Sequence, residues 1–381
     1  MSDPDFAPRD PAVLEALFRP KAVAVVGAST QPEKLGYQVF KNLAEAGFGG
    51  PLYPVNPKAD LILDRKAFPT VADLPEAIDL AVIIIPARLV PESIRACGRK
   101  GARAAIVISG GFSESGPEGE RLQQEAVAAA REASIGLVGP NCQGVNNPYH
   151  GLCASWPLLT TRGRVAIISQ SGTVGAALMD WAAQEELGVS AVVSMGNRGD
   201  LDESDLLGYF AADPNTRAIA LYLEGIKSVP RFLRAVAACP KPVVVLKAGR
   251  TPKGRKAAES HTRSLAGRDE IYEGAFRQHR IHRAATLEEL YDAAKALAYL
   301  TRPAGRRIGI ITSSGGSGIL ATDAAEMAGL DVAPLPEALR AGSRTTMSRV
   351  EKGVDSSPWP YTLFALLLSA EWFLRKRRNV I

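Results

Sequence analysis

Short apolar runs alternate with longer polar and apolar stretches along most of the chain. The runs are rich in Val and Ile and show no polar alternation, which indicates strands buried on both faces of a parallel sheet. They cover Lys21–Val26, Leu80–Ile85, Ala104–Ile108, Arg164–Ile168, Val189–Val193, Ala218–Leu223, Pro242–Lys247 and Arg307–Ile311. Intervening segments such as Gly119–Ala133 and Leu287–Leu300 are dense in Ala, Glu, Arg and Leu, as in helices. This βαβα order predicts an α/β protein with doubly wound parallel sheets.

Several of the predicted strands end in small residues or proline. In open α/β sheets, ligands bind at the carboxyl ends of the strands, so these endings are candidate binding loops. They are Gly27–Ser29, Ile85–Pro86, Ser109–Gly111, Ser169–Gly172 and Thr312–Gly316.

A repeated segment divides the chain into modules. Residues 163–172 resemble residues 305–315: each begins with Gly-Arg, continues as an apolar strand and ends in a small-residue loop before an Ala-rich helix. We read them as two copies of one α/β unit. The predicted modules are residues 1–150, 160–302 and 303–350, the last too short to be complete, followed by an atypical tail at 353–381.

The tail contains an apolar segment, Trp359–Leu374, with aromatic residues at both ends and four cations, Arg375–Arg378, after it. Aromatic and basic flanks are typical of membrane segments. However, the segment is shorter than the ~20 residues a span needs, and it contains Glu371. A helix packed on a partner or on the third module, a membrane-associated tail, and an artificial junction to another reading frame all fit this pattern.

Charge and composition narrow the function classes. The chain has 45 Lys and Arg against 40 Asp and Glu, but without the four terminal cations the net charge falls from +5 to +1. The body is therefore nearly neutral, and we expect no nucleic-acid partner. The four cysteines are far apart with no CxxC motif, and we expect neither disulfides nor a metal site. The acidic, Pro-rich start is not a signal peptide, so the body is expected to be cytoplasmic.

The first candidate site is the loop Gly27-Ala28-Ser29, followed by Lys34 and a helix from about Tyr37. A strand, a small-residue turn and a helix N-terminus form a phosphate site from backbone N–H groups. The next predicted strand ends in Asn56 and Lys58, where an NAD site would carry an acidic residue. A cation there favours a ligand with an additional ribose phosphate, either NADP or coenzyme A. A Rossmann-like domain without a nucleotide is the alternative.

Two further segments are candidates for chemistry. Gly139-Pro140-Asn141-Cys142 is either a generic turn or a ligand-facing loop at the end of the first module. His261 lies in a stretch of small and polar residues with several cations before it. A lone histidine is commonly structural, but a neutral imidazole can attack a phosphoryl group when a carboxylate holds its other nitrogen. Glu224, at the end of a predicted strand, is the candidate carboxylate.

Taken in order, the motifs resemble the NDP-forming acyl-CoA synthetase superfamily, which includes ADP-forming acetyl-CoA synthetases and, more distantly, the alpha subunit of succinyl-CoA synthetase. The resemblance extends from about Leu17 to Leu339. It covers Val26–Ser29, Tyr53–Lys58, Gly110–Glu114, Gly139–Cys142, Ser169–Gly172, Gly196-Asn197 with Asp202 and Asp205, Leu223–Gly225, and Ser260–Thr262.

The resemblance implies a Rossmann-like domain that binds coenzyme A, followed by flavodoxin-like domains, the last one incomplete. It implies that His261 is phosphorylated and that Glu224 orients it. Coenzyme A would contact Gly27, Ala28, Ser29, Lys34, Asn56, Lys58, Pro86, Asn141 and Cys142. Phosphate would contact Gly110, Gly111, Ser169, Gln170, Ser171 and Gly172. The implied reaction is acyl-CoA + phosphate + NDP ⇌ carboxylate + CoA + NTP, through an acyl phosphate and a phosphohistidine.

Two departures from the family pattern matter. The family loop reads Ser-His-Thr-Gly, whereas Arg263 replaces that glycine here. No ATP-grasp domain follows within this sequence, so ATP or ADP with Mg²⁺ would bind only through a separate ATP-grasp beta-type subunit. The alternatives are a non-catalytic, regulatory coenzyme A-binding module, tethered to a membrane by its tail, and an NADP-dependent Rossmann oxidoreductase.

Overall fold

The computed structural model describes residues 9–262, 268–279, 281–300 and 305–334, with only the backbone for 259–262. The chain divides into two compact units, Met1–Arg302 and Pro303–Ile381. The tail at 353–381, the linker around residue 302 and Arg263 lie outside the described residues. Among the helices that are described, none has the length and apolar character needed to cross a membrane.

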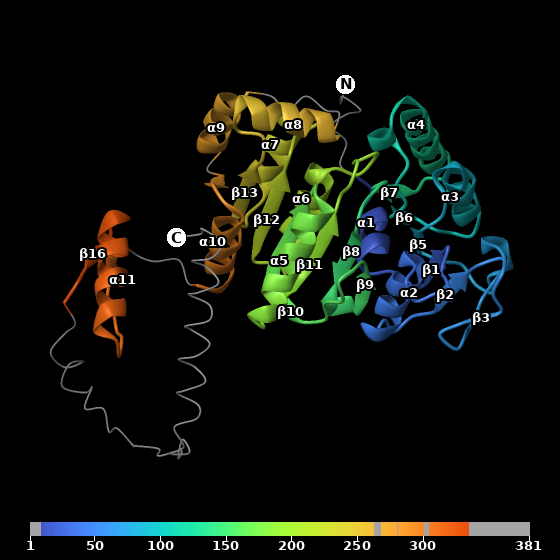
Figure 1. Ribbon diagram of the computed structural model, residues 1–381, viewed down its shortest axis with the longest axis horizontal. Coiled ribbons are helices and arrows are strands. Elements are labelled where there is room, and N and C mark those ends of the chain that lie inside the picture. Colours follow the sequence, from blue (N-terminus) through green and yellow to red (C-terminus); the bar gives the residue numbers. More distant parts are fainter. Residues whose placement is uncertain (1–8, 263–267, 280, 301–304, 335–381) are drawn as a thin grey trace, which may run out of the picture. The chain divides into compact units, whose positions relative to one another are not determined.

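The first half of the large unit contains a five-stranded parallel sheet in the order β2-β1-β5-β6-β7 (Figure 1). Its strands are β1 (Val23–Val26), β2 (Leu52–Val55), β5 (Leu80–Ile83), β6 (Ala104–Val107) and β7 (Gly136–Val138). Its helices are α1 (Pro11–Phe18), α2 (Leu35–Glu45), α3 (Val90–Arg99) and α4 (Pro117–Glu132). A small antiparallel pair, β3 (Leu61–Ile62) and β4 (Arg65–Lys66), lies between β2 and β5 in the chain.

The second half contains a seven-stranded sheet in the order β14-β13-β12-β10-β11-β8-β9. The parallel strands are β10 (Arg162–Ser169), β11 (Val189–Ser194), β12 (Ala218–Leu223), β13 (Val243–Lys247) and β14 (His282–Ala284), and the antiparallel strands are β8 (Gly144–Asn147) and β9 (Leu152–Ala154). The helices are α5 (Gly172–Gln184), α6 (Glu203–Ala212), α7 (Val229–Ala238), α8 (Pro252–Thr262), α9 (Asp269–Gln278) and α10 (Leu287–Tyr299). The α/β class predicted from the apolar runs is confirmed.

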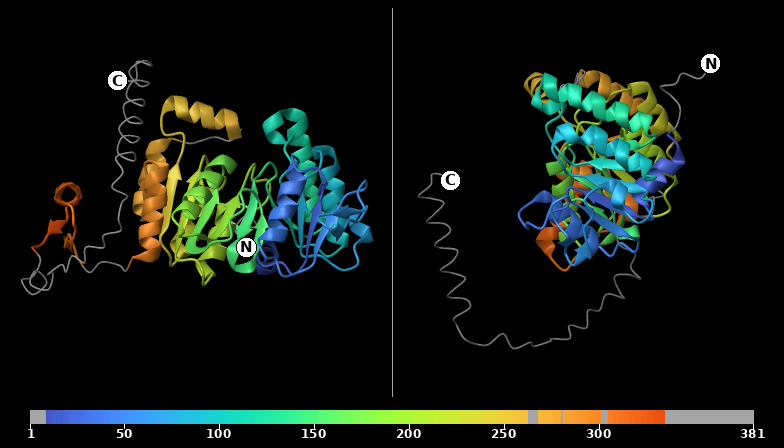
Figure 2. Two further views of the ribbon diagram at one scale, coloured as in Figure 1. Left: turned by 60° about the horizontal axis from the view of Figure 1, so that its bottom comes forward. Right: turned by 90° about the vertical axis from the view of Figure 1, so that its right-hand side faces the viewer.

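Alternate residues of each buried strand pack on opposite faces of its sheet. In β1, Val23 and Val25 belong to one apolar cluster and Ala24 and Val26 to another. The cluster with Val23 also includes Leu206 and Phe232 of the second half. The two sheets therefore share one hydrophobic core, and helices cover both faces of each sheet in Figure 2.

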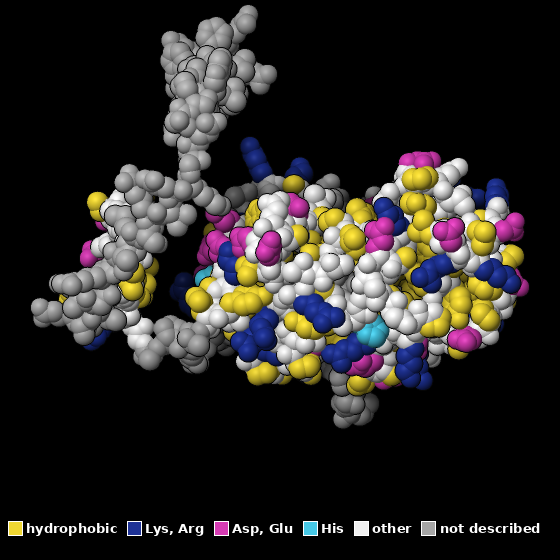
Figure 3. All heavy atoms as spheres, turned by 90° about the horizontal axis from the view of Figure 1, so that it is seen from below, with side chains coloured by type: hydrophobic (Ala, Val, Ile, Leu, Met, Phe, Trp, Pro, Cys, Tyr) yellow, Lys and Arg dark blue, Asp and Glu magenta, His cyan; other side chains and the backbone are white. Residues whose placement is uncertain are grey.

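Backbone hydrogen bonds also join the two halves. The N–H groups of Asn197, Gly199 and Leu201 donate to the carbonyls of Pro140, Gly139 and Leu137, at 2.8, 2.7 and 3.0 Å. β8 lies within the first 150 residues of the chain, yet it pairs with β11 of the second sheet. On the face of the molecule in Figure 3, basic, acidic and apolar side chains are interspersed.

The small unit is described over residues 305–334. β15 (Arg307–Ile308) and β16 (Asp331–Val332) pair in parallel, and α11 (Gly315–Met327) lies between them in the chain. The repeated segments have the same local structure: Ser171 caps α5 by accepting from Val174 N–H, and Ser314 caps α11 by accepting from Ser317 N–H. We propose that residues 303–350 are a partial second copy of this α/β unit.

One exposed glycine in a helix gives a simple test of the fold. Gly274 lies inside α9, and an added Cβ would meet no atom within 4 Å. Gly274→Ala is therefore expected to raise the free energy of unfolding by about 1 kcal/mol, the difference in helix propensity. Urea unfolding followed by circular dichroism measures this, and a decrease in stability would contradict the described position of α9.

Candidate functional site

In each sheet, the chain places the next strand on one side of an initial strand and later strands on its other side. The candidate loops directly follow these initial strands. In the first sheet, β1 lies between β2 and β5; in the second, β10 lies between β11 and β12. A crevice forms at the carboxyl ends of the strands at such a switch point, and ligands of open α/β sheets bind there. The loops after β1 and β10 are Gly27–Ser29 and Ser169–Gly172, two of the segments singled out from the sequence.

A cavity of about 590 Å³ connects the carboxyl edges of the two sheets. The first half contributes Leu35 at the start of α2, Ile108 after β6, and Cys142. The second half contributes Gly172 at the start of α5, and Arg198. The cavity thus reaches from one switch-point helix, α2, to the other, α5.

The loop after β1 is packed closely against the backbone that follows β5. Gly27 has φ +92°, and a Cβ on it would lie 2.1 Å from the carbonyl oxygen of Ile84. Asn56 supports this loop, since its Nδ2 donates to the carbonyl of Ala28 at 2.7 Å. Ser29 is buried, and its hydroxyl accepts from the backbone N–H of Gln31.

The N-terminus of α2 is open to a ligand. Its cap residue, Lys34, makes no side-chain capping hydrogen bond, and its side chain is exposed. Lys58 is also exposed, after β2, while Pro86 is exposed at the start of a short 3₁₀ turn after β5. Free helix N–H groups with cations nearby suit a phosphate ester.

The turn before α5 is held by its own side chains. The hydroxyl of Ser169 donates to the carbonyl of Ser171 at 2.6 Å and accepts from the Ser171 N–H at 3.2 Å. Gln170 points to the neighbouring strand end: its Oε1 accepts from the N–H groups of Glu224 and Gly225 at 2.6 and 3.1 Å. Its Nε2 donates to the carbonyl of Gly225 at 2.7 Å.

The amide of Gln170 is therefore engaged with the backbone beside Glu224. This geometry supports a positioning role for Gln170, fixing the backbone of Glu224, in place of the phosphate contact expected from the sequence. The side chain of Glu224 is 7% exposed. Ser171 and Gly172 remain at the cavity wall.

Glu114 occupies the turn at Gly110 and Gly111. Its Oε1 accepts from the N–H groups of Gly111 and Phe112 at 2.6 and 3.0 Å, and its Oε2 accepts from Asn197 Nδ2 at 2.5 Å. Burial by itself would raise the pKa of Glu114, but these hydrogen bonds outweigh it and the pKa is lowered. The Gly111 N–H, expected to face phosphate, is thus bonded to a carboxylate of the same turn.

Asn141 and Cys142 lie on the cavity wall where the two halves meet. Asn141 Nδ2 is 3.3 Å from Asn197 Oδ1, across the junction. The Cys142 thiol donates to the carbonyl of Val107 at 3.3 Å, and burial raises its pKa to about 12. Cys142 is therefore a thiol at neutral pH, not a nucleophile.

His261 lies in a helix, which corrects the loop expected from the sequence. α8 spans Pro252–Thr262, so His261 is in its last turn. The reason is local: Lys256, Ala257, Ala258 and Glu259 are strong helix formers, and they outweigh the small polar residues that follow. The side chain of His261 lies outside the described residues, so its pairing with Glu224 stays a prediction.

Comparison with known proteins identifies the family. A family model described as "CoA binding domain" matches residues 21–148, and one described as "Succinyl-CoA ligase like flavodoxin domain" matches residues 162–297. The alpha subunit of acetate–CoA ligase (ADP-forming) I from Pyrococcus furiosus is 47% identical over 324 residues, covering 83% of this chain and 70% of that subunit. The chain belongs to the NDP-forming acyl-CoA synthetase family. The resemblance read from the motifs is confirmed.

Other members of this synthetase family differ in length. Acetate–CoA ligase (ADP-forming) I from Archaeoglobus fulgidus is 45% identical over 323 residues, and the match covers 84% of this chain but 47% of that protein. This chain thus spans about half the length of that relative. Acetyl-coenzyme A synthetase 1 of Ca. Korarchaeum cryptofilum, solved with phosphate and ADP, has a TM-score of 0.80 and 42% identity, covering 87% of this chain and 72% of that one.

Sequence reasoning missed three polar groups at the synthetase cavity. Glu114 and Asn197 stood within quoted motifs but were given no role, and Arg198 was not named. The available signal was weak: Arg198 directly follows the Gly196-Asn197 motif. Among the described residues, no group of three or more His, Cys, Asp or Glu side chains could hold a metal ion.

The bridge made by Glu114 predicts a pH-dependent effect on stability. Because its folded-state pKa is lowered, Glu114 contributes stability above the ordinary carboxyl pKa, and that contribution disappears as pH falls through the folded value. Glu114→Gln is expected to destabilise the chain at neutral pH, with the difference from wild type shrinking on acidification. Urea unfolding of both proteins over an acidic-to-neutral pH series measures this difference in stability. A difference that stays constant with pH would contradict a stabilising role for the ionised Glu114 carboxylate.

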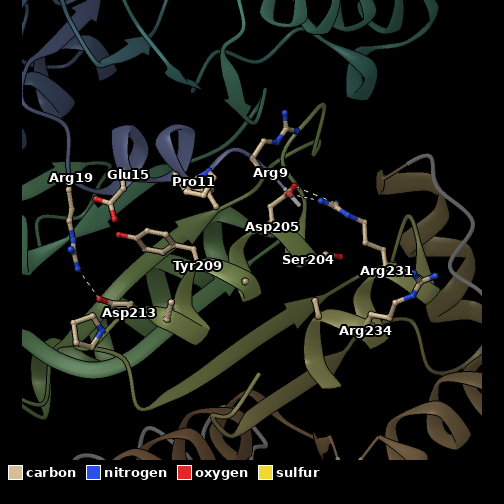
Figure 4. Close-up of a pocket in the computed structure, with 15 residues that line it drawn as sticks. Arg9, Pro11, Glu15, Arg19, Ser204, Asp205, Tyr209, Asp213, Arg231 and Arg234 are labelled. Carbon is tan, nitrogen blue, oxygen red and sulfur yellow. Dashed lines mark hydrogen bonds and ion pairs between the residues drawn. The ribbon is translucent and has the colours of Figure 1, made fainter. Parts of the chain in front are cut away.

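A second cavity, of about 570 Å³, lies between α1, α6 and α7 (Figure 4). Arg19 pairs with Asp213 at 3.1 Å at one end, and Arg231 pairs with Asp205 at the other. Arg231 Nη1 also lies 2.7 Å from Asp202. Tyr209, between these pairs, stacks on Phe18 with ring centroids 4.4 Å apart.

Proposed function

We propose that this chain is the coenzyme A-binding, alpha-type part of an NDP-forming acyl-CoA synthetase. The reaction is acyl-CoA + phosphate + NDP ⇌ carboxylate + CoA + NTP. The observation that carries this proposal is the cavity between the two sheets, because it is lined both by the start of α2 and by the start of α5, the helices that follow the two switch points.

The first half fits coenzyme A. The glycine loop at Gly27, the uncapped start of α2, and the exposed cations Lys34 and Lys58 suit its phosphorylated nucleotide end. Asn141 and Cys142 on the cavity wall would lie near its thiol end, with the Pro86 turn also along its path.

The chemistry proceeds in three balanced steps. Phosphate attacks the acyl-CoA thioester carbonyl, the C–S bond breaks, and an acyl phosphate and CoA form. His261 then attacks the phosphorus, the P–O bond to the acyl group breaks, and the carboxylate leaves. Finally a terminal phosphate oxygen of NDP attacks the phosphorus, the N–P bond to His261 breaks, and NTP and the free imidazole form. Glu224 orients the imidazole, and the α5 N-terminus with Ser171 and Gly172 holds the phosphoryl oxygens.

The last step also needs a unit that binds the nucleotide. We infer that an ATP-grasp beta-type subunit binds ATP or ADP with Mg²⁺, as expected for a chain whose relatives include separately encoded alpha subunits.

The first experiment is calorimetric titration of the purified chain with coenzyme A, with NADP as the control ligand. Binding of CoA and not of NADP is the expected result. Binding of NADP alone would favour an oxidoreductase and contradict the proposal. CoA binding without phosphorylation, when acyl-CoA and phosphate are supplied, would leave a non-catalytic binding module.

A further inference from the structure

Arg198 is a buried cation on the wall of the synthetase cavity. It lies in the loop between β11 and α6, and its side chain is 4% exposed. Its Nη1 donates to the carbonyl of Gly225 at 2.8 Å, the same carbonyl that receives Gln170 Nε2. The guanidinium is thereby fixed beside the turn that leads into α5.

The donors of Arg198 are largely unused within the described part of the chain. A guanidinium carries five N–H donors, and the structure gives this one a single hydrogen bond, to Gly225. Its nearest carboxylate is Glu203, at 3.6 Å, which is an ion pair without a hydrogen bond. Glu203 is 1% exposed, and its Oε2 has no hydrogen-bond partner among the described residues.

Arg231, on α7, is an arginine whose two terminal nitrogens are both paired with carboxylates. Its two terminal nitrogens contact Asp202 and Asp205, and it lines the second cavity, not the synthetase cavity (Figure 4). Arg198 differs in having a single carboxylate at ion-pair distance, 3.6 Å, and in lining the same cavity as Gly172.

We propose that Arg198 binds the phosphoryl oxygens of phosphate and acyl phosphate at the N-terminus of α5. This rests on the proposed function and names the side chain that supplies positive charge to that site. Helix N–H groups supply only partial charges, and a charge-assisted, fork-shaped donor complements them. Glu203 is a positioning residue, because its carboxylate lies 3.6 Å from the guanidinium in the buried loop. The negative charge of Glu203 also offsets part of the positive charge of Arg198 and so weakens the attraction for the bound anion.

The test is titration of inorganic phosphate into the full chain, with dissociation constants from phosphorus NMR line widths. Arg198→Gln is expected to weaken phosphate binding roughly tenfold or more, the size of one or two charge-assisted hydrogen bonds. Arg198→Lys should have an intermediate effect, because it keeps the charge and loses the fork. Burial raises the pKa of Glu203, and mildly alkaline pH favours its ionised form. At that pH, Glu203→Gln removes a negative charge beside Arg198 and should tighten phosphate binding severalfold.

The matched controls are Arg231→Gln and Arg231→Lys, which should change phosphate affinity less than twofold. Coenzyme A affinity is measured for every variant and should stay at the wild-type value. The opposite signs at Arg198 and Glu203 separate anion binding from a purely structural role, in which both changes would weaken binding.

Three outcomes would overturn the proposal: wild-type phosphate affinity in Arg198→Gln, equal losses in the Arg198 and Arg231 variants, or no phosphate binding by a wild-type chain that binds coenzyme A. If Arg198→Gln misfolds and loses coenzyme A affinity, Arg198→Lys is the deciding variant. Weaker phosphate binding with wild-type coenzyme A affinity supports the proposal, and wild-type phosphate binding contradicts it. Failure of the wild-type chain to bind coenzyme A is a different result, and it contradicts the proposed function itself.

Discussion

Replacing His261 with alanine is expected to reduce phosphorylation of the chain to background. In the proposed reaction the imidazole nitrogen forms the only covalent bond between phosphorus and protein, so no other group substitutes for it. The wild-type chain is incubated with acyl-CoA and radiolabelled phosphate, and the protein-bound label is counted after acid and after alkali. Phosphohistidine is lost in acid and kept in alkali.

His282 provides the matched control. It lies on β14, half-exposed, with its Nε2 3.4 Å from Glu289, and has no part in the proposed chemistry. His282→Ala should therefore label as wild type does. If label persists in His261→Ala, a residue other than His261 is phosphorylated, and the role proposed for Glu224 is contradicted.

Gly36→Ala is expected to cost roughly ten- to hundredfold in coenzyme A affinity. A Cβ on Gly36 would lie 2.1 Å from the carbonyl oxygen of Gly27, so the start of α2 and the glycine loop would have to move apart. Overpacking of this kind costs about 1–3 kcal/mol. Where coenzyme A binding has to restore the close contact, that energy is subtracted from the binding free energy, and each 1.4 kcal/mol is tenfold in affinity. Calorimetry with coenzyme A measures the loss.

Gly49→Ala is the control for this change, because a Cβ at Gly49 meets nothing within 4 Å. It lies in the exposed loop soon after α2 and should bind coenzyme A as wild type does. Unchanged affinity in Gly36→Ala would show that the ligand does not use the contact between the β1 loop and α2.

The sheets could be predicted because their strands are buried on both faces. In β10 the segment Val165–Ile168 is a continuous apolar run, and the loop after the strand is marked by small residues. β8 escaped prediction for the opposite reason: it reads Gly-Val-Asn-Asn, yet all four residues are buried. The Nδ2 groups of its asparagines donate to carbonyls elsewhere in the chain, Leu159 for Asn146 and Phe18 for Asn147, which no local pattern reveals.

The loops of the candidate site could be found from the sequence, but the partners of their side chains could not. Gln170 belongs to a motif that suggested phosphate, and its amide is used by the backbone beside Glu224, 54 residues away. Glu114 depends on a contact between the two halves, and Arg198 depends on the carbonyl of Gly225, 27 residues further along the chain. Such roles follow from tertiary packing, which motif order does not encode.

The way β8 and β9 join the second sheet decides how this protein can be divided. Cutting the chain near residue 150 would separate β8 from β9 and from β11, the strand with which β8 pairs. The edge of β11 would then be uncovered in the C-terminal fragment, and an uncovered edge strand favours association with other chains. A chimera that exchanges coenzyme A-binding halves between relatives should therefore cross over before Gly144, and should keep Leu137–Asn141 matched to the Asn197–Leu201 segment that it bonds. The order of the motifs suggests two interchangeable modules. However, the hydrogen bonds and the strand pairing that join the two halves mean that they have to be kept matched when the protein is engineered.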